Sequence, residues 1–180
     1  MQELTGPASE VAPRLLGSLL VRTFADGSQV TVRIVETEAY DQTDAASHSY
    51  RGRTPRTDIM FGPPGHLYVY FTYGMHYCCN IVTGTEGEGS AVLIRAVELV
   101  DGELPGYDKT NGPARLCKAL RIDKLLNGHD LSSPPLQLEL QPPPKDYVTT
   151  TRIGISQAQD KPWRFYLDDS DFVSVRAKNR

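Results

Sequence analysis

Two glutamates end a run of residues that otherwise alternates like a strand with one apolar face. With a period of two, this face carries, in order, Val30, Val32, Ile34, Glu36 and Glu38. A carboxylate on a face that is turned toward the core costs free energy unless it is paired, and burial raises its pKa toward the range of a general base. The pattern indicates either a catalytic carboxylate or a glutamate that pairs with an arginine across the sheet.

Arg95, in a second strand-like run, is the candidate partner. The alternation in this run places on one face Ala91, Leu93, Arg95 and Val97. Arg95 is therefore a charge within an apolar stripe. A buried pair of glutamate and arginine can be structural, or it can hold a water molecule for chemistry.

An aromatic segment at residues 66–80 surrounds a turn signal, Tyr73-Gly74-Met75. The segment holds four of the nine tyrosines, two of the four histidines and two of the three cysteines of the chain. These residues predict a hairpin whose arms have aromatic faces and whose tip exposes Tyr73 and Met75. Such a hairpin can stack on a flat partner, of which a nucleobase is the best example, or it can pack its tyrosines into an ordinary core.

The composition predicts one ordinary globular domain that covers residues 1–180. Apolar residues make up 39% of the chain and charged residues 23%, and no stretch of 18 apolar residues occurs. The first 17 residues lack the basic start and the apolar stretch of a signal peptide. We therefore expect a cytoplasmic protein, or a nuclear one in a eukaryote, with no membrane partner.

The formal net charge of −3 weighs against a nucleic-acid partner, but the basic residues are clustered. Three of them, Arg51, Arg53 and Arg56, gather in one loop just before the aromatic hairpin. A second cluster has the spacing of a solvated helix face and comprises Arg115, Lys118, Arg121 and Lys124.

The cysteines and histidines show no spacing typical of a metal site or a disulfide framework. Cys78 and Cys79 are adjacent, and together with Cys117 they are odd in number. We expect all three to be buried small apolar residues, and we predict no metal and no cofactor.

The expected secondary structure is mostly strands joined by turns. We expect a first helix that ends near 13–17, a second helix at 114–121, and strands at 19–24, 29–39, 67–72, 77–83, 91–99, 153–155, 163–167 and 172–175. This order predicts the α+β class, as a single domain with a curved antiparallel sheet, a protruding β-hairpin and flanking helices.

Nine segments, in order along the chain, together resemble the alkyladenine (3-methyladenine) DNA glycosylase family. They are residues 33–40, 46–49, 52–56, 60–70, 73–80, 92–95, 112–117, 152–155 and 164–166. The resemblance extends from about residue 13 to residue 175, and nine ordered matches of this kind are highly specific.

The resemblance implies a catalytic centre and a purine pocket. Glu38 matches the general base that deprotonates water for attack at C1′ of a flipped nucleotide. Arg95 matches a residue that helps to hold this water and the nearby DNA backbone. Asn80 matches a pocket residue that disfavours the exocyclic amine of guanine. The walls that sandwich the extruded purine match Tyr40, His48 and Tyr70.

The resemblance also implies a DNA-binding surface around this pocket. Tyr73 matches the side chain that is pushed into the duplex where the base has left. The family contacts DNA around the lesion at positions that match Arg53, Thr54, Arg56, Met75 and His76. The implied partner is double-stranded DNA that contains damaged purines, and we expect the protein to bind it as a monomer.

The implied function is a DNA repair glycosylase that flips alkylated purines of the 3-methyladenine type and hydrolyses their N-glycosidic bond. Hypoxanthine and etheno-adenine are further candidate lesions, and the product is an abasic site. No lysine falls in the matched pocket, so we expect a monofunctional enzyme that leaves the abasic strand intact.

Two other functions stay open on the sequence. A non-catalytic module that recognises lesions would need no carboxylate beside the glycosidic bond, so Glu38 distinguishes it from an enzyme. A hydrolase of free nucleosides or glycosides could use Glu36 and Glu38 as a pair, because their Cβ atoms would lie roughly 7 Å apart along one strand. That hydrolase leaves the Tyr73 tip and the arginine loop without a role.

Overall fold

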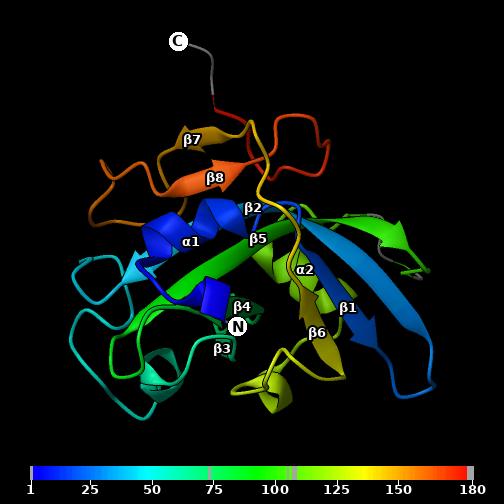
Figure 1. Ribbon diagram of the computed structural model, residues 1–180, viewed down its shortest axis with the longest axis horizontal. Coiled ribbons are helices and arrows are strands. Elements are labelled where there is room, and N and C mark those ends of the chain that lie inside the picture. Colours follow the sequence, from blue (N-terminus) through cyan, green and yellow to red (C-terminus); the bar gives the residue numbers. More distant parts are fainter. Residues whose placement is uncertain (1, 73, 105, 107–108, 178–180) are drawn as a thin grey trace.

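The chain forms a curled antiparallel sheet, shaped like half a barrel, with two short helices. The computed structural model describes residues 2–72, 74–104, 106 and 109–177 (Figure 1). Within this part of the chain the strands are β1 (Leu19–Thr23), β2 (Gln29–Asp41), β3 (Leu67–Phe71), β4 (Tyr77–Val82), β5 (Ser90–Asp101), β6 (Leu136–Glu139), β7 (Val148–Thr150) and β8 (Arg164–Tyr166). The helices are α1 (Ala8–Arg14) and α2 (Pro113–Ala119), with short 3₁₀ turns η1 (Gln2–Leu4), η2 (Asp58–Phe61) and η3 (Lys124–Leu126). The predicted α+β class with an antiparallel sheet and a β-hairpin is confirmed.

Two long strands, β2 and β5, form the centre of the sheet and pair with each other along most of their length. The strand order is β3-β4-β5-β2-β1-β6, and β8 pairs with both β2 and β7. The first half of β2 pairs with β1 on its other edge, whereas the second half pairs there with β8. The second half of β2, which carries both glutamates, is therefore enclosed on both edges (Figure 1).

A pair of bulges where β2 meets β5 changes which side chains face the core. Val35 has no partner on β5 and Arg95 has none on β2, because the register shifts on both sides of Glu36. A bulge leaves one residue unpaired and re-aims the side chains that follow it. As a result, Val35 and Ala39 belong to the hydrophobic core, whereas Glu36 and Glu38 point to the opposite side of the strand.

The predicted alternation from Val30 to Glu38 is therefore wrong at its C-terminal end, where the two glutamates lie. The residues before the bulge do face the core, but the two carboxylates do not share their face. On β5, likewise, Val97 packs in the core while Arg95 points to the glutamates. Sequence periodicity cannot reveal this change, because a bulge adds a residue without leaving a compositional signal.

Both helices pack against the sheet through apolar residues at helical spacing. In α1, Val11 and Ala12 are fully buried, and the Thr37 hydroxyl donates to the Ala12 carbonyl oxygen over 3.0 Å. In α2, Leu116 and Cys117 face β4 and β5, and Pro113 at the first position supplies a φ suited to a helix start.

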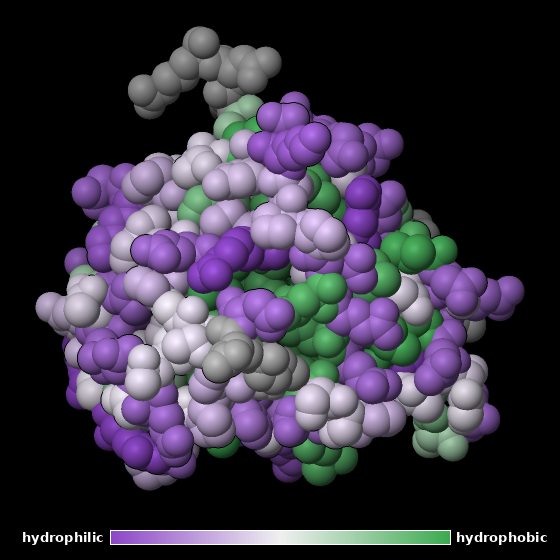
Figure 2. Space-filling model, viewed as in Figure 1, coloured by the Kyte–Doolittle hydropathy of each residue, from purple (hydrophilic) through white to green (hydrophobic). Residues whose placement is uncertain are grey.

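The face seen in Figure 2 is polar over most of its area, with apolar residues in a central hollow. The three cysteines are buried and free, as predicted.

Two of the predicted strands are loops, and two observed strands were not predicted. Segments 153–155 and 172–175 are irregular, and β6 and β7 occur where no strand was expected. The amide of Ile153 donates to Glu38 and the amide of Ser174 donates to Glu36, so both segments use their backbone on carboxylates instead of on a neighbouring strand. None of the described helices is long and apolar enough to cross a membrane.

Candidate active site

A cavity of about 650 Å³ lies where β2, β5 and the β3–β4 hairpin meet the loops at 44–48 and 153–157. Its lining includes every residue that the sequence assigned to catalysis or to purine binding, namely Glu38, Arg95, Tyr40, His48, Tyr70 and Asn80. These residues come from four strands and one loop, and the curled sheet brings them together. The cavity is also lined by Met60, Tyr68, Leu93, Pro113 and residues of the two loops.

The Glu38 carboxylate is fully buried yet lines this cavity. Its Oε1 accepts from the Ile153 amide over 2.8 Å. Its Oε2 accepts from the Tyr40 hydroxyl over 2.8 Å and from Arg95 Nη1 over 3.3 Å. A carboxylate has about four acceptor sites, so these three donors fix the group and leave room for one more donor, such as a water molecule.

The neighbouring carboxylate of Glu36 has a different environment. It accepts from Arg95 Nε over 3.2 Å, from Arg164 Nη1 over 2.8 Å, and from both the amide and the hydroxyl of Ser174 over 2.7 and 2.9 Å. Glu36 is fully buried and is not part of the cavity lining. The arrangement contradicts a hydrolase that uses Glu36 and Glu38 as a catalytic pair, because Glu36 is held by Arg95, Arg164 and Ser174 and does not line the cavity.

Tyr40 forms one wall of the cavity and donates to the catalytic candidate. Burial, and then the adjacent charge of Glu38, raise the pKa of Tyr40 well above its usual range. The hydroxyl therefore keeps its proton at neutral pH and remains a donor to Glu38.

His48 and Tyr70 line the same cavity and form a second wall. Their rings meet edge to face with centroids 4.5 Å apart. Burial, and then the charge of Arg56, lower the pKa of His48 to about 4, so its ring is neutral at physiological pH. Tyr68 lies beneath this wall and shares a 3.0 Å hydrogen bond with His48 Nδ1. Tyr68 is almost fully buried, and it also lines the cavity and orients His48.

Asn80 is held in one orientation at the cavity surface. Its Nδ2 donates to the Tyr68 carbonyl oxygen over 3.1 Å, and only 4% of the residue is exposed. A fixed amide can discriminate between the edges of bound purines, because it cannot turn to suit each one.

The residues expected at the DNA surface lie around the cavity or on exposed loops. Arg56 reaches over the Tyr70 ring, with 5.9 Å from its Cζ to the centroid. Arg53 pairs with Asp58 over 2.5 Å on the surface, and Thr54 bonds the hydroxyl of Thr57. At the hairpin tip, Met75 is 76% exposed and His76 is also exposed. Tyr73, expected as the duplex wedge, lies outside the described residues.

Sequence reasoning missed a second layer of residues behind Tyr40. Asp44 and Arg152 form a fully buried ion pair, and the Arg152 guanidinium lies over the Tyr40 ring, with 4.6 Å from its Cζ to the ring centroid. Arg152 begins a segment that matched the family, and the residues directly after it, 153–155, were expected to form a strand. A buried charge in a loop of small and polar residues has no periodicity, so composition alone could not have found it.

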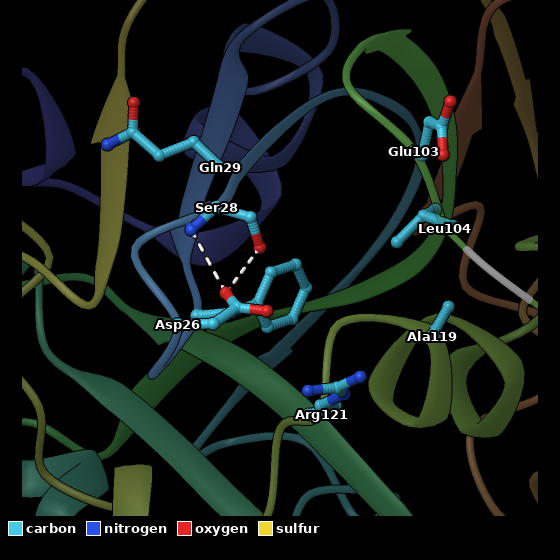
Figure 3. A pocket seen from close by; sticks show the side chains of 8 residues that line it. Asp26, Ser28, Gln29, Glu103, Leu104, Ala119 and Arg121 are labelled. Carbon is cyan, nitrogen blue, oxygen red and sulfur yellow. Dashed lines mark hydrogen bonds between the residues drawn. The ribbon is translucent and has the colours of Figure 1, made fainter.

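A second, smaller cavity of about 350 Å³ lies at the β1–β2 turn (Figure 3). Asp26 accepts there from the amide and the hydroxyl of Ser28 over 3.0 and 2.6 Å, which are contacts internal to the turn. Arg121 stacks on Phe24 at 4.9 Å. None of the predicted site residues lines this cavity, and its polar contacts stabilise the turn. In the described part of the chain, no group of three or more histidine, cysteine or acidic side chains is placed to hold a metal ion.

Comparison with known proteins gives one family and many similar chains. The sequence model of a family described as methylpurine-DNA glycosylase matches residues 2–171. A protein of Carboxydothermus hydrogenoformans is 50% identical over 178 residues, which cover 92% of this chain and 93% of the relative. A protein of Desulfitobacterium hafniense is 48% identical over 189 residues, with 92% and 93% covered. A protein of Methanoculleus marisnigri is 50% identical over 182 residues, with the same coverage. All three carry the name "Putative 3-methyladenine DNA glycosylase".

Proposed function

The chain belongs to the methylpurine-DNA glycosylase family, and from this premise we propose that it is a DNA-3-methyladenine glycosylase. It is an N-glycosylase of base excision repair that acts on alkylated purines. We propose further that it binds duplex DNA as a monomer, flips the damaged nucleotide into the cavity, and acts on chromosomal DNA inside the cell.

The observation that carries the mechanism is the buried Glu38 carboxylate at the cavity surface, with three donors and one acceptor site left. A water molecule in that site donates one proton to Glu38. As the proton moves to the carboxylate, the water oxygen bonds to C1′ of the flipped nucleotide, and the bond from C1′ to the purine nitrogen breaks with its electron pair leaving on the base. The products are a free purine and an abasic site.

The walls of the cavity suit a cationic purine. A purine alkylated at N3 carries a positive charge, which stacks favourably between Tyr40 on one side and the His48–Tyr70 wall on the other. Because the His48 ring is neutral, it adds no repulsion. The charged base also leaves without a proton donor, since bond cleavage itself neutralises it.

The abasic strand stays intact in this mechanism. Cleavage of the strand by a glycosylase needs an amine that forms a Schiff base with C1′. No lysine is among the residues that line the described cavity. Borohydride trapping is expected to give no covalent complex, and a trapped complex between protein and DNA would contradict the monofunctional mechanism.

The direct test is base release from methylated duplex DNA by the wild type and by Glu38→Gln. The matched control is Glu98→Gln, which alters a carboxylate on β5 that pairs with Arg33 outside the cavity. We expect Glu38→Gln to lose base release roughly 100- to 10,000-fold while lesion-containing duplex still binds. Unchanged release by Glu38→Gln would contradict the mechanism. No release by the wild type would favour a non-catalytic lesion-binding module.

The same assay with duplexes that contain hypoxanthine or etheno-adenine tests whether the enzyme also releases these bases. These bases are neutral, so they gain less from cation–π stacking and are poorer leaving groups. We expect slower release than for methylated purines in the same cavity.

A further inference from the structure

Behind the Tyr40 wall lies an ion pair that does not touch the cavity. The side chains of Asp44 and Arg152 are both fully buried, and Arg152 donates to Asp44 through Nη1 and through Nη2, the latter over 3.0 Å. Arg152 also donates to the carbonyl oxygens of Ala39 over 2.8 Å and of Ala158 over 3.2 Å. Burial alone would lower the pKa of Arg152, but the hydrogen bonds and charge of Asp44, together with the nearby Tyr40 and Glu38, outweigh it and raise the pKa, so the guanidinium stays charged.

The Arg152 guanidinium is stacked between two aromatic rings. Its Cζ lies 4.6 Å from the centroid of Tyr40 and 5.3 Å from that of Trp163. A planar guanidinium can stack on ring faces while its edges hydrogen-bond to a carboxylate, which an ammonium group cannot do. This placement leaves Arg152 Nε buried and, among the residues that the structure describes, without a hydrogen-bond partner. Such an unpaired donor costs free energy, so the position of the guanidinium is better explained by the stack than by its hydrogen bonds alone.

Two of the three donors to Glu38 depend directly on Arg152. The first is the Tyr40 hydroxyl, whose ring rests on the guanidinium. The second is the amide of Ile153, the residue that follows Arg152 in the chain. The third donor, Arg95, comes from β5 and is held separately by Glu36.

The Asp44 end of the pair fixes a third part of the cavity. Asp44 Oδ1 accepts from the Ala46 amide over 3.2 Å, and the Asp44 carbonyl oxygen accepts from the Ser47 amide over 2.8 Å. Ala45, Ala46 and His48 of this loop line the cavity. One buried ion pair therefore links the Tyr40 wall, the Ile153 amide and the loop that carries His48.

We propose that Arg152, held by Asp44 and stacked between Tyr40 and Trp163, is a positioning residue for base release. It fixes two of the three hydrogen-bond donors to Glu38 and, through Asp44, the loop that carries His48. The inference rests on the proposed glycosylase function. Because the side chain has no exposed surface, it contributes to the chemical step and not to DNA binding.

The test measures base release in a single turnover, with enzyme in excess over methylated duplex, together with equilibrium binding of the same duplex. A rate constant measured in this way does not depend on the folded fraction as long as folded enzyme remains in excess. We expect Arg152→Lys to slow release roughly 10- to 100-fold, because a small displacement of a catalytic group costs about that much, while binding is nearly unchanged. The matched control is Arg176→Lys, which alters a surface arginine that pairs with Asp168.

A double-mutant cycle separates positioning from a general loss of structure. If Arg152 acts largely through Tyr40, Arg152→Lys and Tyr40→Phe together slow release less than the product of their separate effects. Fully multiplicative effects, or a rate for Arg152→Lys equal to that of Arg176→Lys, would overturn the proposal.

Trp163→Leu covers the case in which Arg152→Lys does not fold. It removes one ring of the stack and leaves the ion pair with Asp44 intact, at a residue that is only half-buried. We expect slower release with unchanged binding, and an unchanged rate would overturn the proposal. A wild type without base release would instead overturn the proposed function, and the positioning role with it.

Discussion

Glu36 and Glu38 lie two residues apart on β2, and both side chains are fully buried. Both contact Arg95, at 3.2 and 3.3 Å. By residue type, strand and burial the two positions are nearly the same. Their surroundings nevertheless assign them to different tasks.

The difference lies in what each carboxylate faces. Glu36 has four donors, counted over the described residues, lies beneath Arg164 and Ser174, and is not part of the cavity lining. Glu38 has three donors by the same count and lines the cavity. A buried carboxylate that is held away from the cavity stabilises its neighbours, whereas one that lines the cavity can take a proton from a bound water. Chemistry here depends on access to the cavity, not on burial alone.

Loss of Arg95 should affect both carboxylates at once. Arg95→Gln leaves two buried carboxylates without a shared cation, so we expect a loss of about 5 kcal/mol in the free energy of unfolding, together with slower base release. Urea unfolding and single-turnover release measure the two effects. Arg33→Gln is the matched control, because Arg33 pairs with Glu98 while each side chain remains about one third exposed (32% and 30%), and we expect it to cost less than about 1 kcal/mol. Equal losses in the free energy of unfolding for Arg95→Gln and Arg33→Gln would contradict the role of Arg95 as the shared partner of both carboxylates.

Glu36→Gln should act on stability first. Removal of this charge leaves Arg164 with no carboxylate and weakens the attachment of Ser174, so we expect a loss of about 3 kcal/mol by urea unfolding. Base release by the folded fraction should change far less than with Glu38→Gln. A stable Glu36→Gln variant would contradict the structural role of this carboxylate.

Tyr40→Phe removes one donor from Glu38 and leaves the ring in place. We expect base release to slow roughly tenfold, since a hydrogen bond to a charged group contributes about 1.5–3 kcal/mol and only part of this is specific to the transition state. The free energy of unfolding should change by less than about 1 kcal/mol, because the stack on Arg152 persists. A large loss in the free energy of unfolding with an unchanged rate of base release would show that Tyr40, like Glu36, has a structural role and not a role in base release.

The smallest effect concerns the charge of His48, in the wall that it forms with Tyr70. The pKa of His48 lies at about 4, lowered first by burial and then by Arg56. An unfolded chain takes up this proton near pH 6.5, so the contribution of His48 to stability is present above that pH and is lost as the pH falls toward about 4. Arg56→Gln should raise the pKa of His48 by removing a nearby positive charge. A histidine titration followed by NMR checks this, and a wild-type value near 6.5 would contradict a neutral wall at pH 6.

The sequence predicted most of the cavity but not the reason for its chemistry. Glu38, Arg95, Tyr40 and Tyr70 lie in segments with strong local signals, and the structure places them around one cavity. The side of the strand to which Glu38 and Arg95 point could not be derived, because the bulges at Val35 and Arg95 invert the alternation in the middle of β2 and β5.

The supporting contacts could not be derived either, because they join segments that are far apart in the chain. Ile153 lies 115 residues from Glu38, and Ser174 lies 138 residues from Glu36. Both segments were expected to be strands because they contain β-branched and apolar residues. Their amides instead satisfy buried carboxylates, which is a tertiary demand that local propensity does not register.

The most direct test of this account is the single-turnover rate of base release from one methylated duplex by Glu36→Gln and Glu38→Gln, measured side by side with folded enzyme in excess. We predict that Glu38→Gln slows release roughly 100- to 10,000-fold, while folded Glu36→Gln retains most of the wild-type rate. Equal losses in the two variants, or a greater loss in Glu36→Gln, would contradict the assignment of the chemistry to the carboxylate that lines the cavity.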